Sequence, residues 1–107
     1  PYAGLPTVRR IPSTGDLLFI WVSEKSTIEE NGRKLPLRSA LTTAISRDEG
    51  KTFLHQRNIV QDPTNDFGYQ CIEFIDGDLA LIAYHTNDGL HLARINVDWF
   101  YGEQVDP

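Results

Sequence analysis

Short runs of β-branched, leucine and aromatic residues alternate along the chain with clusters of glycine, asparagine, aspartate and proline. Clusters of this kind at short intervals are typical of tight turns between strands. No run reaches the roughly ten to twelve residues with a 3.6-residue period that indicate a helix. The pattern therefore predicts an all-β, antiparallel fold with about seven strands. They are expected at residues 7–11, 17–22, 41–46, 53–60, 69–75, 79–85 and 90–97.

The apolar positions within these runs predict how deeply each strand is buried. Residues 17–22 and 79–84 are apolar almost throughout, which is typical of strands covered on both faces. Residues 41–46 alternate between larger apolar and smaller or polar side chains, as in a strand with one more polar face. The polar and charged segment 23–36 is expected to be an exposed loop.

The chain contains a weak internal repeat. Gly15-Asp16-Leu17 and Gly77-Asp78-Leu79 each lead from a tight turn into an apolar strand, and they lie 62 residues apart. β-Propellers repeat a four-stranded blade about every 40–50 residues, and a ring closes with about 4–8 blades. The excursion at 23–36 accounts for the longer spacing. About seven strands make about two blades, so we expect either part of a propeller or a different sandwich.

Residues 46–53 match the Asp-box pattern Ser-x-Asp-x-Gly-x-Thr-Trp/Phe at every fixed position. This pattern suits a hairpin turn, because the carboxylate accepts hydrogen bonds from turn amides and the glycine supplies a positive φ. The aromatic residue then covers the edge of the sheet. We therefore expect a structural role for the five residues of the motif, which are Ser46, Asp48, Gly50, Thr52 and Phe53.

With the Asp box, three further segments make most of the chain resemble the C-terminal part of a sialidase-like (BNR/Asp-box) β-propeller. Residues 10–12 read Arg-Ile-Pro, like a blade start, and residues 38–46 read Arg-x-x-Leu-Thr-x-x-x-Ser and run into the Asp box. The stretch from Tyr69 to the Asp-Trp-Phe-Tyr sequence at 98–101 is similar to the family's closing segment. The resemblance implies four-stranded blades of a six-bladed propeller, with one blade at 1–62 and the final blade at 63–107. The chain is thus expected to be a segment of a longer protein.

The resemblance also implies an activity, that of an exo-α-sialidase, which hydrolyses terminal sialic acid or a related sugar from glycans. In this family three arginines hold the substrate carboxylate, a tyrosine is the nucleophile, a glutamate activates it and an aspartate is the acid/base. A neutral tyrosine suits an anionic substrate that would repel a carboxylate, and the planar arginine fork matches a carboxylate. By position, Tyr69 is the implied catalytic nucleophile, and Arg38 and Arg10 are the implied substrate-binding arginines.

The chain departs from the family pattern in one important respect. No segment matches the acid/base aspartate or the activating glutamate, so the 107-residue chain alone is expected to be inactive and to need the remaining blades as partners. Two other functions stay open: a non-catalytic carbohydrate-binding or scaffold Asp-box propeller, and a hydrolase of a different sugar. Arg38 also fits an exposed arginine at a strand start, and Tyr69 a tyrosine at a blade edge.

The resemblance implies a glycan substrate and the remaining blades as partners, and composition argues against several others. The net charge is −5 without a run of like charges, which argues against a nucleic-acid or membrane-binding surface. No apolar run is long enough to span a membrane. The three histidines lack metal-ligand spacing and no glycine-rich phosphate loop occurs, so neither a metal nor a cofactor is expected. The single Cys71 excludes an intrachain disulfide and is expected to be a buried small side chain.

Overall fold

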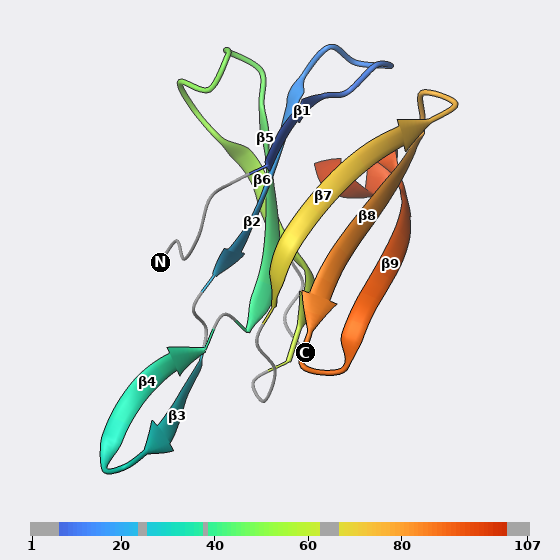
Figure 1. Cartoon of the computed structure of the whole chain (residues 1–107). Helices are drawn as coiled ribbons and strands as arrows, with labels where there is room; N and C mark the ends of the chain where they lie inside the picture. Colours follow the sequence, from blue (N-terminus) through green and yellow to red (C-terminus); the bar gives the residue numbers. More distant parts are fainter. Residues whose placement is uncertain (1–6, 24–25, 38, 63–66, 103–107) are drawn as a thin grey trace.

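The computed structural model describes residues 7–23, 26–37, 39–62 and 67–102. Within these ranges the chain forms nine β-strands and one short 3-10 helix, and every strand pairing is antiparallel (Figure 1). The all-β, antiparallel fold predicted from the turn spacing is thereby confirmed. No helix in this part of the chain has the length and apolarity to cross a membrane.

The first sheet contains four strands in the order β1-β2-β5-β6. Neighbours in the sheet are also neighbours along the chain, apart from the hairpin β3–β4 inserted between β2 and β5. The pairing of β5 with β6 shifts its register twice, whereas β2 and β5 pair without interruption. The four strands are β1 (Thr7–Arg10), β2 (Leu17–Ser23), β5 (Ala40–Ser46) and β6 (Leu54–Gln61).

The inserted hairpin replaces the loop predicted at residues 23–36, which was wrong. It consists of β3 (Ser26–Glu30) and β4 (Arg33–Leu37) and projects away from the two larger sheets (Figure 1). Its turn residues Asn31 and Gly32 have φ values of 52° and 76°, as a two-residue hairpin turn with both centres left-handed requires. The strands were missed because their composition is polar.

The second sheet contains three strands in the order β7-β8-β9. Glycines at the start of the repeated motif, Gly15 and Gly77, stand just before the second strand of each sheet with φ values of 79° and 78°. The sheet comprises β7 (Gly68–Ile75), β8 (Leu79–Thr86) and β9 (Gly89–Asn96), and the 3-10 helix η1 (Val97–Tyr101) follows.

The hydrophobic core lies between the two sheets. There β7 runs beside β1 and β2: the Thr7 hydroxyl donates to the Gln70 carbonyl (3.1 Å), and the Gln70 side-chain Nε2 donates to the Ile20 carbonyl (3.3 Å). The η1 helix packs against β5, β6 and β9 and adds a fully buried aromatic ring. Core residues from the three parts include Leu18, Ile20, Leu41 and Ile45, then Ile72, Ala80 and Ile82, and finally Val97 and Phe100.

Burial along the strands differs from the prediction at two places. Every residue of β5 is buried, including Thr42 and Thr43, although one more polar face was expected there. Its hydroxyls are accommodated by hydrogen bonds, since Thr42 Oγ1 lies 2.8 Å from Ser23 Oγ and donates to Asn58 Oδ1 (2.8 Å). In β2, buried and half-buried residues alternate, so this strand is not fully covered on both faces.

Both sheets carry apolar side chains on the face turned away from the shared core. On β2, Phe19 and Trp21 are half-buried and alternate with the core residues, so they lie on the opposite face. On β9, Leu90 and Leu92 are 70% and 63% exposed and likewise alternate with core-packed residues. Neither outer face is covered by another sheet within the described residues.

Candidate functional site

The Asp-box turn connects β5 to β6, and the side chain of Asp48 organises it. Asp48 Oδ1 accepts hydrogen bonds from the Thr52 amide (2.8 Å) and the Ser46 hydroxyl (3.0 Å), and Oδ2 accepts from the Thr52 hydroxyl. Ser46 Oγ accepts in turn from the Gly50 amide (2.8 Å), at a glycine with φ of 89°. These bonds, that from the Thr52 hydroxyl most of all, lower the pKa of Asp48 below its ordinary value. The carboxylate is thus fully engaged in the turn.

The aromatic residue of the Asp box covers the outer face of the first sheet. The Phe53 ring meets the Phe19 ring edge to face, with centroids 4.9 Å apart and an interplanar angle of 87°. Phe53 itself remains 51% exposed. This contact anchors the turn to β2 and leaves an aromatic surface open.

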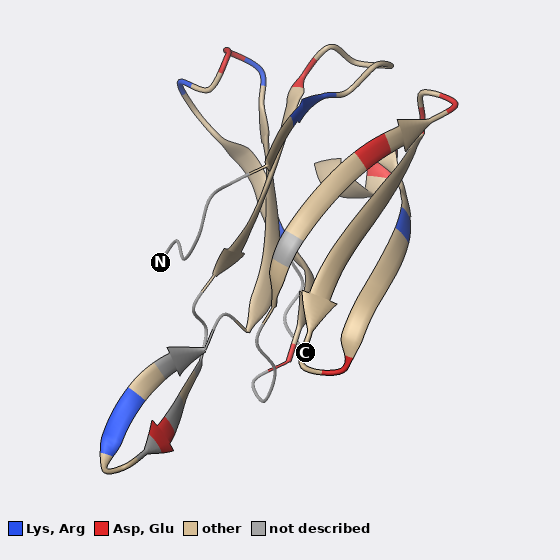
Figure 2. Ribbon diagram, viewed as in Figure 1, with Lys and Arg blue, Asp and Glu red and all other residues tan. Residues whose placement is uncertain are grey.

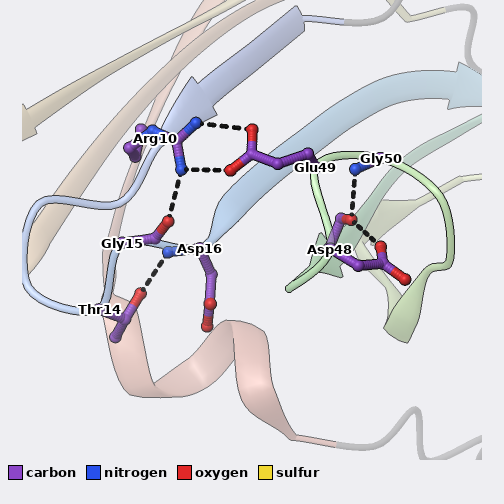
Figure 3. A network of polar contacts seen from close by, with 8 residues as sticks. Arg10, Thr14, Gly15, Asp16, Asp48, Glu49 and Gly50 are labelled. Carbon is purple, nitrogen blue, oxygen red and sulfur yellow. Dashed lines mark hydrogen bonds and ion pairs between the residues drawn. The ribbon is translucent and has the colours of Figure 1, made fainter.

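Arg10 lies at the end of β1 beside the Asp-box turn (Figure 3). Its guanidinium binds both carboxylate oxygens of Glu49, at 3.1 and 2.9 Å, and donates to the Gly15 carbonyl (2.7 Å). Hydrogen bonding to Arg10 lowers the pKa of Glu49, and the pair raises the pKa of Arg10. Arg10 therefore joins the β1–β2 turn to the Asp-box turn, and its fork is occupied by a carboxylate of this chain.

A second polar contact joins η1 to the same turns. The Tyr101 hydroxyl donates to Asp16 Oδ2 (2.7 Å) and lies 2.8 Å from Thr14 Oγ1, and burial raises the pKa of Tyr101. Arg47, in the Asp-box turn, lies with Nε 3.6 Å from Asp16 Oδ2 and its guanidinium 5.5 Å from the Tyr101 ring centroid. Sequence reasoning missed these contacts because their partners lie up to 87 residues apart.

Tyr69 is the second residue of β7, and the register with β8 shifts at this point. Gly68 pairs with His85 whereas Cys71 pairs with Ala83, so β7 carries one extra residue between the two pairs. This is a β-bulge, a feature that is frequent next to active sites. The side chain of Tyr69 lies outside the described part of the structure.

Of the two expected arginines, the structure describes Arg10, which lies at the other end of β1 from the residue that contacts β7. Gln70, next to Tyr69, contacts Thr7 at the start of β1, whereas Arg10 ends that strand at the Asp-box turn. Arg38 lies outside the described residues. The strand that follows Arg38, β5, begins at Ala40 and ends at the Asp box, so its start is the end remote from Arg10.

The structure also contains a groove that the sequence did not reveal. It lies beside the edge of the second sheet, has a volume of about 410 Å³, and includes none of the expected site residues. One cation, Arg94, stands among mostly apolar side chains. The groove is lined by Ile59, Ala93, Arg94, Ile95, Asn96 and Trp99.

Other chemistry in the described residues is sparse. No three His, Cys, Asp or Glu residues of this part of the chain gather closely enough to hold a metal ion. Cys71 is exposed, contrary to the prediction, because it alternates on β7 with the core residue Ile72 and so faces outward. The Lys and Arg residues of the described ranges are spread over separate elements (Figure 2).

No family model, curated protein or solved structure matches this chain.

Proposed function

We propose that the chain forms two neighbouring blades of a sialidase-like β-propeller and supplies Tyr69 and Arg38 to an exo-sialidase site. Other blades of the same protein would supply the acid/base aspartate and the activating glutamate. The ligand is the carboxylate-bearing end of a glycan, and the reaction is hydrolysis of its terminal glycosidic bond.

The observation that carries the proposal is the Asp-box turn within a four-stranded antiparallel sheet. A meander of four strands is the unit from which propellers are built, and the first sheet has this order apart from one inserted hairpin. The side-chain bonds of Asp48 to Ser46 and Thr52 use the fixed polar positions of the motif. A second sheet packs beside it through strands β1, β2 and β7, as consecutive blades do at a propeller axis.

The uncovered outer faces of both sheets also support the proposal. Phe19, Trp21 and Phe53 on one side, and Ile75 with its neighbours on the other, would be buried if further sheets stacked on each end. Apolar faces of this kind usually mark a contact surface. In a propeller each blade contacts a blade on both sides, so two open faces are expected of two blades taken from a ring.

The chemistry asked of Tyr69 and Arg38 follows from the charge of the substrate. A sialoside bears a carboxylate on its anomeric carbon, so a neutral phenol approaches this carbon without charge repulsion. In the proposed reaction the Tyr69 oxygen bonds to the anomeric carbon as the bond from this carbon to the leaving oxygen breaks; the Tyr69 proton passes to the activating glutamate, and the leaving oxygen takes a proton from the acid/base aspartate. Water then attacks the anomeric carbon and gives a proton back to the aspartate, while the Tyr69 oxygen leaves and regains its proton from the glutamate. Arg38 holds the carboxylate through two parallel hydrogen bonds.

The experiment is a titration of the ¹⁵N-labelled chain with N-acetylneuraminate, followed by amide chemical shifts. We expect amide chemical-shift changes at the start of β7 and at the start of β5. Because the site is incomplete, the Kd should be about 1 mM or weaker. Arg38→Ala should abolish the shifts, whereas Tyr69→Phe should retain them because only the reacting hydroxyl is lost. Arg9→Ala is the matched control and should bind like the parent chain.

Two results would contradict the proposal. One is the absence of any shift in β7 up to saturating sugar, and the other is an equal response to neutral N-acetylglucosamine. A fluorogenic sialoside should not be hydrolysed by this chain alone, so turnover would contradict the need for residues from other blades.

One observation favours a second candidate, a propeller that binds carbohydrate without cleaving it. Arg10, one of the expected arginines, is bound to Glu49 at the Asp-box end. A site with fewer arginines needs no carboxylate on its ligand. Binding of neutral glycans with the same affinity as sialylated ones, mapped to the same strands, would favour this candidate over the hydrolase.

A further inference from the structure

We infer that two copies of this chain associate through the outer edge of β9, forming one continuous six-stranded sheet. Within the described residues β9 pairs with β8 alone, so its other edge is open. Open edges of this length are normally blunted by proline, lysine or a bulge. The sequence of β9, GLHLARIN, has no proline or lysine, and its pairing with β8 continues without a shift over eight residues.

The alternation of hydrogen bonds along β9 identifies the residues whose backbone N–H and C=O groups are available to a partner strand. A two-residue loop joins Thr86 to Gly89, and the Val97 amide donates to the Asp78 carbonyl (2.8 Å) in the same ladder. In an antiparallel pair the bonded residues alternate, so odd-numbered residues from Gly89 to Val97 bond to β8. The N–H and C=O groups of Leu90, Leu92 and Arg94 therefore point away from the sheet.

The side chains of the same residues are also exposed. Leu90 and Leu92 are 70% and 63% exposed, the two highest values among the large apolar residues described. Both lie on the outer face of the sheet, on the side remote from Ile95, which packs against the core. A strand added here would cover two leucines and satisfy the outward backbone groups of Leu90 and Leu92 in one step.

A second copy of β9 fits this edge through charge complementarity. A two-fold axis at His91 pairs Leu90 with Leu92 of the other copy, and Leu92 with its Leu90, so four leucines meet on one face. The same register brings Arg94 near the other copy's Asp88, which stands in the turn just before β9, and the contact occurs twice. The neighbouring register centred on Leu92 would instead set Arg94 against a leucine, so the charges select the axis at His91.

The symmetry closes the assembly at two copies. Each edge is used once and the same surface serves both partners, so the contact does not propagate into a filament. The area is smaller than that of a standard interface of about 1,600 Å², and the dimer is accordingly weak and depends on concentration. This inference does not rest on the proposed glycosidase function.

The test is sedimentation velocity of the 107-residue chain from about 10 µM to about 1 mM, a range that covers weak association. We expect a shift from monomer to dimer across this range. Leu92→Lys should leave only monomer, with an unchanged far-UV circular dichroism spectrum because the side chain is exposed. Ile75→Lys, a matched change on the same face of the far strand, should still dimerise.

A charge exchange tests the register. Arg94→Asp and Asp88→Arg should each weaken the dimer by about two- to fivefold, as expected for exposed pairs, and the double variant should restore it. In a Cys71→Ser background, His91→Cys should form a disulfide-linked dimer on mild oxidation, because residues facing each other without direct backbone bonds lie about 4.5 Å apart. Glu73→Cys in the same background should not.

Three outcomes would overturn the inference: a chain that stays monomeric at the highest concentration, a dimer that survives Leu92→Lys, or a dimer abolished by Ile75→Lys. The last would show association through the face of the sheet instead of its edge.

Discussion

The guanidinium of Arg57 stacks on the indole ring of Trp99, with Cζ 3.7 Å from the ring centroid, while its Nη1 donates to the Trp99 carbonyl (2.7 Å). One side chain on the last strand of the first sheet thus binds both the ring and the backbone of the helix that follows the second sheet. The two sheets are joined here at their outer edge, opposite the contact between β7 and β1.

Replacing Arg57 should therefore loosen this edge. Arg57→Ala removes the stacking, the hydrogen bond and the packing of the aliphatic stem, and we expect it to lower the free energy of unfolding by about 1–3 kcal/mol. Arg57→Lys keeps the charge but loses the planar fork, so its loss should be intermediate. Urea denaturation followed by Trp fluorescence measures both. Arg9→Ala, an exposed control, should change stability little, and an equal loss there would refute a specific role for Arg57.

The Asp box offers a second prediction. Asp48→Asn keeps the shape of the side chain but removes the charge that the Ser46 and Thr52 hydroxyls and the Thr52 amide stabilise. We expect Tm to fall by about 5 °C in thermal unfolding. Asp88→Asn in the β8–β9 turn is the matched control, because its carboxylate takes no hydrogen bond within the described residues. A fall of the same size in the control would show a general effect of charge.

The stabilisation from Asp48 should also disappear in acid. Hydrogen bonds lower the pKa of Asp48 in the folded chain, so the carboxylate stabilises the fold above the unfolded pKa of about 3.9 and loses this effect as pH falls through the folded pKa. The Tm difference between the parent chain and Asp48→Asn should thus be largest near neutral pH and shrink below about pH 4. Thr52→Ala should raise the pKa of Asp48 in a ¹³C carboxyl titration, and an unchanged value would contradict the assigned cause.

The Tyr101 hydroxyl gives a fourth prediction. Tyr101→Phe removes the donor to Asp16 and leaves the ring in place, so we expect a loss of about 1 kcal/mol in the free energy of unfolding. Amide exchange should show the loss first in η1 and in the β1–β2 turn. Exchange that accelerates uniformly over all strands would mean that this contact does not hold η1 locally.

Local pattern predicted most strands of this protein but not the contacts that join them. The seven expected strands all occur, and each end lies within one residue of its predicted limit, because tight turns and apolar runs are local features. The β3–β4 hairpin was missed although Asn31-Gly32 is a turn signal, since its polar strands lack the alternation that burial on one face produces.

Contacts between residues that are far apart in the chain could not be predicted from the local sequence. The burial of Thr42 depends on Ser23 and Asn58, which lie 19 and 16 residues away and satisfy its hydroxyl. The ion pair of Arg10 with Glu49 spans 39 residues, so an arginine that matched a substrate-binding motif carries a partner that the motif did not indicate. Of the implied site, the sequence located Tyr69 on a strand but not its bulge.

The hairpin between β2 and β5 has a consequence for how this protein can diversify. Its two strands pair with each other and have no comparable packing against any other described element. Its opening is therefore a local event that leaves the two sheets intact, and its tip should tolerate an insertion. A longer segment inserted between Asn31 and Gly32 would present new side chains far from the core. Related sequences can therefore acquire a different binding surface at this hairpin while they keep the same fold.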